Sequence, residues 1–85
     1  MYSDLASNSK MKNSRIEYSQ FLELLKQARK DAQLTQTEAA KKLGKHQSFV
    51  AKCESGERRV DVIELACFAR IYGKSVSFFL KKEKE

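Results

Sequence analysis

After residue 17, hydrophobic residues recur every three or four positions, which is the period of an amphipathic helix. The first such stripe predicts a helix from about Ser19 to Ala32. Its apolar positions are Phe21, Leu22, Leu25, Ala28 and Ala32. The alternation typical of strands is missing and the chain contains no proline, so we expect an all-α fold.

Capping residues predict where the second and third helices begin and end. Thr35, with Glu38 three residues later, has the sequence of a capping box and opens the second helix. Gly44 ends this helix, because glycine readily adopts the positive φ of a tight helix exit. A third helix is then expected from about Gln47 to Ser55.

Two further helices are expected after a charged loop. Asp61 and Glu64 form a second capping box, which opens a helix that reaches Tyr72. Ser75 is expected to cap a short final helix that ends near Leu80. Five helices joined by short loops predict one compact all-α domain.

The chain divides into three parts by composition. Residues 1–17 are rich in serine, asparagine and lysine, so we expect a flexible arm. Residues 18–82 contain the helical signals and are expected to form the domain. Residues 83–85 are a charged tail.

Net charge indicates the class of partner. The 85 residues contain 17 Lys and Arg against 11 Asp and Glu, which gives a formal net charge of +6. A basic excess attracts polyanions, so nucleic acid is the favoured partner, and a merely basic soluble surface is the alternative. With 41% hydrophobic and 33% charged residues, the composition is that of a globular protein and not of a disordered one.

Cysteine usage and hydropathy indicate the compartment. Cys53 and Cys67 lie in apolar runs without a second pair of ligands at metal spacing. We expect reduced packing residues, and a disulfide is the less favoured alternative. No stretch approaches the ~18 apolar residues of a membrane span, and the polar N-terminus lacks a signal-peptide core. The expected location is therefore cytoplasmic, with no membrane partner.

The stretch from Gln36 to Ser55 carries the functional signal. Two short helices meet at a glycine turn, with small or apolar residues at the positions where they cross. These residues are Ala39, Ala40, Leu43, Gly44, Val50 and Cys53. They are expected to hold the second helix against the first and to leave its opposite face outward, which is the geometry of a helix-turn-helix.

The chain from Leu25 to Leu80 resembles the Xre/Cro family of helix-turn-helix transcription regulators, which includes the lambdoid phage repressors. The most specific segments are LTQTEAA and LGKHQSFVAKCESGERR. The resemblance covers about residues 19–80 and implies a five-helix, lambda-repressor-like domain. It also implies sequence-specific binding of duplex DNA by a homodimer on an inverted-repeat operator, and regulation of transcription as a repressor or as an activator. Arg29 and Glu54 are implied to pair and to anchor the third helix to the first.

Helix position and the resemblance together predict the DNA-contacting residues. Gln47, Ser48 and Lys52 lie on the outward face of the third helix and are predicted base contacts, because glutamine matches an adenine edge and lysine suits guanine. Phe49 either touches a thymine methyl or packs on the turn. Phosphate contacts are expected at the ends of both helices and in the following loop. These are Thr35, Gln36, His46, Ser55, Arg58 and Arg59.

The fourth helix is apolar on two faces. The face expected to meet the core contains Val62, Leu65, Ala66, Ala69 and Tyr72, and Val76, Phe79 and Leu80 are expected to join it. A second stripe contains Ile63, Cys67 and Ile71, to which Phe78 is added. A second apolar face in a thin domain needs a partner, so we expect a two-fold dimer seam there. Closure of the core by some of these residues is the alternative.

Two rival functions remain open at this point. One is an antitoxin that neutralises a protein toxin and regulates its own synthesis, although the chain has no long toxin-binding extension. The other is a regulator whose dimer is split by a small regulatory protein. An enzyme is not expected, because the sequence has one histidine, no Ser-His-Asp set and no phosphate-cradling glycine loop. No cofactor or metal is expected either.

Overall fold

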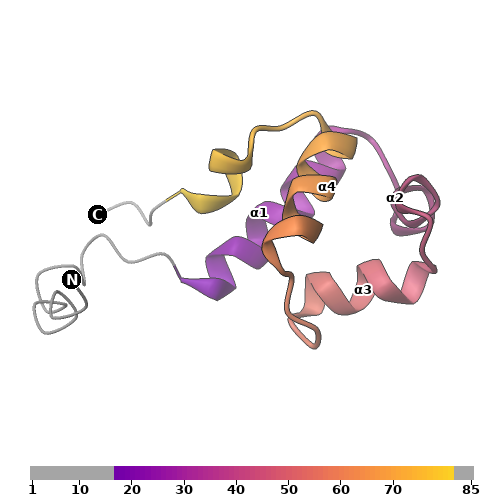
Figure 1. Cartoon of the computed structure of the whole chain (residues 1–85), viewed down its shortest axis with the longest axis horizontal. Helices are drawn as coiled ribbons and strands as arrows, with labels where there is room; N and C mark the ends of the chain where they lie inside the picture. The colour runs from indigo at the N-terminus through magenta and orange to yellow at the C-terminus, as the bar shows by residue number, and fades with distance from the viewer. Residues whose placement is uncertain (1–16, 82–85) are drawn as a thin grey trace, which may run out of the picture.

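The computed structural model describes residues 17–81, which form four α-helices and a terminal 3₁₀-helix (Figure 1). The elements are α1 (Tyr18–Asp31), α2 (Gln36–Leu43), α3 (Gln47–Ser55), α4 (Val62–Tyr72) and η2 (Val76–Leu80). The described part contains no strand, so the prediction of an all-α domain is confirmed. The expected arm, apart from Glu17, and the expected charged tail lie outside the described residues.

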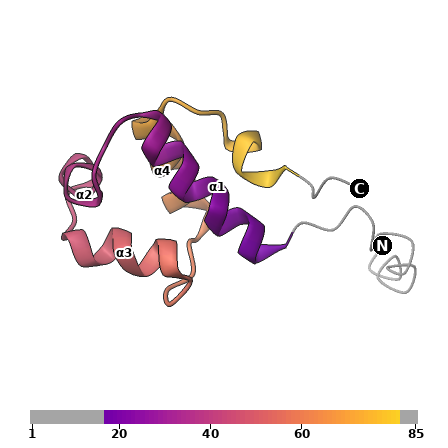
Figure 2. The ribbon, with the colours of Figure 1, turned by 180° about the vertical axis from the view of Figure 1, so that it is seen from behind.

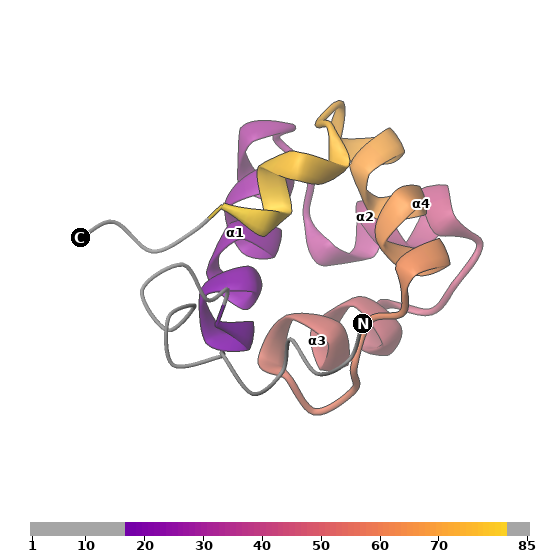
Figure 3. The same cartoon turned by 60° about the vertical axis from the view of Figure 1, so that its left-hand side comes forward.

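The helices surround a single core with α3 at its edge. Helices α1 and α4 cross in the middle of the molecule, with α4 in front in Figure 1 and α1 in front in Figure 2. Helix α3 and the 3₁₀-helix η2 lie on opposite sides of the core (Figure 3). Helix α3 packs most closely on α2 and α1, whereas η2 packs on α1 and α4. One side of α3 therefore remains available on the outside of the domain.

Local hydrogen bonds fix the starts of α2 and α4, and both predicted capping boxes are confirmed. The Thr35 hydroxyl accepts from the Glu38 amide at 3.1 Å, and the Glu38 carboxylate accepts from the Thr35 amide at 2.8 Å. Asp61 and Glu64 exchange the same two bonds at 2.7 and 3.0 Å. Ser75 is the N-cap residue of η2 as expected, but its side chain makes no capping bond, and its hydroxyl lies 2.9 Å from that of Ser77.

Two glycines determine how the chain enters and leaves α3. Gly44 has a φ of 71° and joins α2 to α3 by the tight turn expected from the sequence. Gly56 has a φ of 86° and ends α3. A Cβ atom at Gly56 would lie 2.9 Å from Cδ1 of Leu22, the end of a flexible side chain that can shift, so it is the positive φ that favours glycine here.

The core draws on all five elements. The buried hydrophobic residues are Phe21, Leu25, Ala28, Ala39, Ala40, Val50, Cys53, Leu65, Phe68, Ala69, Tyr72 and Phe79. The expectation that Val62 and Ala66 face the core is wrong, since both are exposed. Helix α4 is rotated so that its own residue Phe68 lies on the inner face and is fully buried. A phenylalanine buries far more apolar surface than an alanine, so this orientation is the more stable one.

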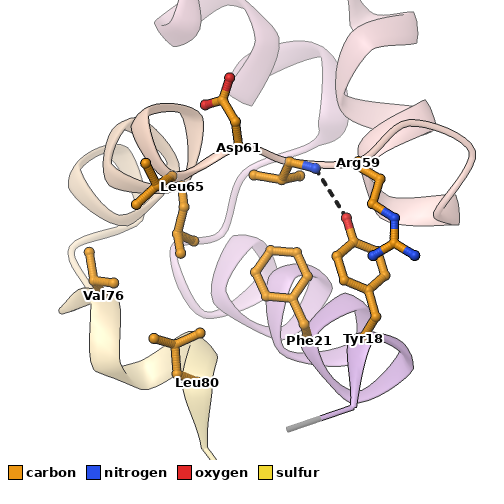
Figure 4. A pocket seen from close by; sticks show the side chains of 9 residues that line it. Tyr18, Phe21, Arg59, Asp61, Leu65, Val76 and Leu80 are labelled. Atoms are coloured by element: carbon orange, nitrogen blue, oxygen red, sulfur yellow. Dashed lines mark hydrogen bonds between the residues drawn. The ribbon is translucent and has the colours of Figure 1, made fainter. Parts of the chain in front are cut away.

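Val76 and Leu80 were also expected in the core, but they are 38% and 43% exposed. Leu80 directly follows the fully buried Phe79, and adjacent residues of a helix point in different directions, so Leu80 is turned outward. Val62, Val76 and Leu80 line an open groove of about 470 Å³ between α1, α4 and η2 (Figure 4). At its edge the Val60 amide donates to the Tyr18 hydroxyl at 3.1 Å.

Candidate nucleic-acid interface

Helix α3 has one buried face and one exposed face. The buried residues are Val50, Cys53 and Glu54. The exposed residues are Gln47, Ser48, Lys52 and Ser55. Apart from Phe49, the predicted base contacts are Gln47, Ser48 and Lys52. All three therefore lie on the exposed face, which begins at the first turn of the helix.

Arg29 of α1 and Glu54 of α3 form the ion pair that the resemblance implied. The Arg29 Nε and Nη2 atoms donate to the two Glu54 carboxylate oxygens at 2.6 and 3.1 Å. The third nitrogen, Nη1, donates to the Leu34 carbonyl at 2.8 Å. The Glu54 side chain is only 3% exposed, and its hydrogen bond raises the pKa of Arg29. The pair ties the C-terminal half of α3 to α1 and to the end of the α1–α2 loop.

Two glutamines extend this ion pair to the start of α3. The Gln36 Nε2 donates to the Glu54 Oε1 at 3.0 Å, and the Gln47 Nε2 donates to the Gln36 Oε1 at 2.6 Å. The first side chain of α3 is therefore connected to α1 through three successive side-chain hydrogen-bond links. Each glutamine amide carries two hydrogens, so both residues retain one hydrogen, and Gln47 retains its oxygen, without a partner among residues 17–81.

Phe49 lies on the side of α3 that is turned toward α4. Its half-buried ring stacks on that of Phe68, with centroids 6.2 Å apart and planes at 10°. The Arg58 guanidinium carbon lies 4.8 Å and the Lys45 Nζ 5.2 Å from the centre of the same ring. Of the two roles considered for Phe49, the structure shows the packing role, and the contact with a thymine methyl stays a prediction.

Arg58 and Arg59, the two arginines of the predicted phosphate clamp, differ in their partners. Both Nη atoms of Arg58 lie 2.8 Å from carboxylate oxygens of Glu64. These bonds raise the pKa of Arg58 and lower the pKa of the Glu64 carboxyl. Arg59 contacts no carboxylate within the described residues, and its guanidinium carbon lies 4.2 Å from the centre of the Tyr18 ring. The charge of Arg58 is thus paired with a carboxylate and that of Arg59 is not within the described residues, and the phosphate contact of each stays a prediction.

The other predicted phosphate contacts lie at the ends of α2 and α3. The Thr35 hydroxyl accepts the capping bond of α2. His46 is exposed and precedes α3, but its side chain makes no capping bond. The Ser55 hydroxyl donates to the Lys52 carbonyl at 3.2 Å and accepts from the Glu57 amide at 3.3 Å.

The four residues predicted to form a dimer seam differ in exposure. Ile63 is 70% exposed, whereas Cys67, Ile71 and Phe78 are half-buried. Ile63 and Cys67 line a small cleft of about 80 Å³ beside Phe49. Ile63 is thus the member of the set most available to a partner.

The two cysteines differ in burial. Cys53 is buried, Cys67 is half-buried, and neither forms a disulfide. Among residues 17–81, no three histidine, cysteine or acidic side chains are grouped so that they could hold a metal ion. Nor does this part of the chain contain a helix with the length and apolar character needed to cross a membrane.

Comparison with known proteins identifies the family. The helix-turn-helix family model HTH_3 matches residues 25–79, from the middle of α1 into η2. Among solved structures, an XRE-family like protein from Pseudomonas syringae pv. tomato str. DC3000 is 39% identical to this chain and superposes with a TM-score of 0.70. The match covers 93% of this chain and 88% of that one. No curated protein matches. The chain belongs to the Xre helix-turn-helix family and is a DNA-binding transcription regulator.

Proposed function

We propose that this regulator binds a specific duplex sequence as a homodimer, with α3 as the recognition helix in the major groove. The observation that carries this proposal is the line of hydrogen bonds from Arg29 through Glu54 and Gln36 to Gln47. It holds the first side chain of α3 in one orientation and leaves its remaining amide groups available to a base.

Gln47 is the proposed reader of an adenine. An adenine edge in the major groove offers the N7 acceptor and the N6 amino donor. Gln47 can give its second amide hydrogen to N7 and accept from N6 through its oxygen, while its first hydrogen stays with Gln36. A side chain that is already oriented loses less conformational entropy when it binds. Ser48 and Lys52, exposed on the same face, are the other proposed base contacts.

Phosphate contacts are proposed on both sides of α3. The second amide hydrogen of Gln36 and the first backbone amides of α2 can bind one phosphate, since a helix N-terminus attracts anions. His46, Ser55 and Arg59 are proposed to contact phosphates elsewhere along the groove. Such contacts give affinity and register but do not read sequence.

The proposed partner in the dimer is a second copy, which would cover the outer face of α4. Ile63 is 70% exposed and the adjacent Val62 72%, and large apolar side chains exposed side by side are typical of an interaction surface. We place Ile63 at the centre of the seam, with Cys67, Ile71 and Phe78 beside it. A two-fold axis would set the recognition helices about 34 Å apart, so that the dimer reads an inverted repeat. Occupancy of this operator would then regulate transcription.

The experiment that tests this proposal is selection of bound duplexes from a random-sequence pool with the full chain. We expect enrichment of an inverted repeat whose half-site centres lie about 10 base pairs apart. Affinity for the selected duplex should fall steeply as salt concentration rises, because phosphate contacts release counterions. A pool without any enriched sequence would contradict the proposal, and so would an affinity that does not change with salt.

A further inference from the structure

We infer that Arg58 and Glu64 form a clamp that sets the orientation of α3 against α4, so that Arg58 acts on recognition by positioning α3 and not by contacting DNA. This inference rests on the proposed role of α3 as the recognition helix. The ion pair of Arg58 and Glu64 is separate from the line of hydrogen bonds that runs from Arg29 to Gln47.

The need for such a clamp follows from how α3 is packed. Its close helix–helix contacts are with α2 and α1, and the pair of α3 and α4 is not among the closely packed pairs of the five described elements. Helices α2 and α1 also pack on α4 and so hold α3 near it, and side chains that bridge α3 and α4 directly add to this restraint. Two bridges are present, the stacked rings of Phe49 and Phe68 and the ion pair of Arg58 and Glu64.

Arg58 is attached to α3 in two places. Its backbone amide donates to the Lys52 carbonyl at 3.1 Å, which fixes Arg58 to the C-terminal end of α3 just after Gly56. Its guanidinium carbon lies 4.8 Å from the centre of the Phe49 ring, near the other end of the helix. Arg58 therefore contacts α3 both at its C-terminal end and at the Phe49 ring, which packs toward α4.

Glu64 is attached to α4 in an equally local way. Its Oε1 accepts from the Asp61 amide at 3.0 Å as part of the capping box, which fixes the carboxylate to the first turn of α4. Both of its oxygens accept from Arg58 at 2.8 Å. An arginine–carboxylate fork with two parallel bonds permits one relative orientation, unlike a lysine–carboxylate contact. The fork therefore joins a point fixed on α3 to a point fixed on α4.

The same pairing argues against a direct DNA contact by Arg58. Its charge is matched by Glu64, and its Nη1 also donates to the Arg59 carbonyl at 3.0 Å. A phosphate would have to displace these bonds. Arg59 has no such carboxylate partner among the described residues, so it is the arginine of this loop that is suited to a phosphate.

Glu64→Gln separates the two roles of Arg58. Glutamine at this position preserves the capping box, because its side-chain oxygen can still accept from the Asp61 amide. It removes the carboxylate that holds Arg58. If Arg58 were a phosphate contact, its release and the loss of a negative charge would strengthen binding to any duplex. A clamp predicts instead that the affinity ratio between the selected duplex and a random duplex falls about tenfold.

The matched control is Glu57→Gln. It removes one negative charge, as Glu64→Gln does, but from the exposed loop before α4 and without touching the clamp, since the hydrogen bond of Glu57 to Ser55 uses its backbone amide. Arg58→Lys is the second test variant. It keeps the positive charge but loses the two-bond fork, so it should lower the affinity ratio as Glu64→Gln does while Glu57→Gln leaves it unchanged.

A readout without DNA makes the result independent of the proposed function. Nuclear Overhauser contacts between the Phe49 and Phe68 rings in the free protein should weaken in Glu64→Gln and Arg58→Lys but not in Glu57→Gln. Circular dichroism verifies that the variants remain helical. Unchanged ring contacts, or an affinity ratio equal to that of Glu57→Gln, overturn the clamp. A wild-type protein with no preference between duplexes overturns the proposed function, and with it the role of the clamp in recognition.

Discussion

The Nε2 atom of Gln47 donates a hydrogen bond of 2.6 Å to the Oε1 atom of Gln36, and Gln36 donates in turn to buried Glu54. This contact joins the first residue of α3 to the first residue of α2. A residue proposed to read a base is thereby coupled to one proposed to bind the DNA backbone. We therefore expect a substitution of either glutamine to change the DNA contact of the other.

Gln36→Ala tests that coupling. We expect weaker binding to the selected duplex and a loss of about 1 kcal/mol in discrimination at the base pair read by Gln47, because Gln47 loses the acceptor that orients it. Fluorescence anisotropy on the selected duplex and on its single-base-pair variants measures both effects. Thr37→Ala, at an exposed position of α2, is the control.

The coupling is quantified by a double-mutant cycle of Gln36→Ala with Gln47→Ala. If the two residues act through their shared hydrogen bond, the double variant should lose less discrimination than the sum of the single variants. Strictly additive losses would show that the two glutamines contribute independently.

Arg29→Ala should strongly destabilise the domain. The change leaves the Glu54 carboxylate buried with only Gln36 as a side-chain donor, and breaking a buried ion pair costs about 3 kcal/mol or more. Urea denaturation followed by circular dichroism measures the free energy of unfolding. Lys30→Ala, at the exposed neighbouring position, should change it little. A loss below about 1 kcal/mol for Arg29→Ala would mean that the pair does not anchor α3.

Tyr72 should make the domain sensitive to alkaline pH. Burial raises the pKa of Tyr72, and its hydroxyl has no hydrogen-bond partner among the described residues. The folded protein therefore keeps a proton that the unfolded chain releases, so this contribution to stability is present below about pH 10 and is lost as pH rises above it.

Tyr72→Phe should remove that pH-dependent loss and raise the free energy of unfolding at neutral pH by about 1 kcal/mol, because no unsatisfied hydroxyl remains buried. Urea titrations at several pH values between neutral and alkaline measure both effects. Tyr18→Phe is the contrasting variant, since it removes a hydroxyl that accepts from the Val60 amide and should destabilise. A lower stability of Tyr72→Phe at neutral pH would show that the hydroxyl has a partner.

The capping boxes and the glycine exits could be predicted from the sequence because each depends on residues within three positions of one another. Thr35 with Glu38 and Asp61 with Glu64 are such local signals, and they placed the starts of two helices correctly. The Gln33 conformation is a local feature without a local signal. Its φ of 61° ends α1 at a position where glycine is usual, so no residue type marked it.

Contacts between elements were harder to predict, because they depend on how the helices rotate when they pack. The sequence predicted a DNA contact for Arg58, but it did not predict that Arg58 forms an ion pair with Glu64, a residue of the α4 capping box. It assigned Gln36 and Gln47 separate roles and did not reveal that they touch. The expectation for Leu80 overlooked that Leu80 directly follows Phe79, and two adjacent helix residues do not face the same side.

Ile63→Asp should yield monomers with a preserved fold. A charge in the apolar seam would have no partner when a second copy covers it, whereas in the monomer the side chain is largely exposed. Sedimentation equilibrium measures the association state and circular dichroism the fold. Ser19→Asp adds the same charge at an exposed position of α1 and should leave the dimer intact. A folded Ile63→Asp protein that remains dimeric would place the seam on another surface.

The most direct test of the account is the sequence preference of Gln47→Ala. The variant should be compared with wild type for affinity to the selected inverted repeat, to the same repeat changed at one base pair per half-site, and to random duplex. The account predicts a loss of roughly 1–3 kcal/mol on the preferred duplex, little loss on random duplex, and relaxed preference at that one base pair. Equal losses on all three duplexes would contradict it, because Gln47 would then contact the DNA backbone and read no base.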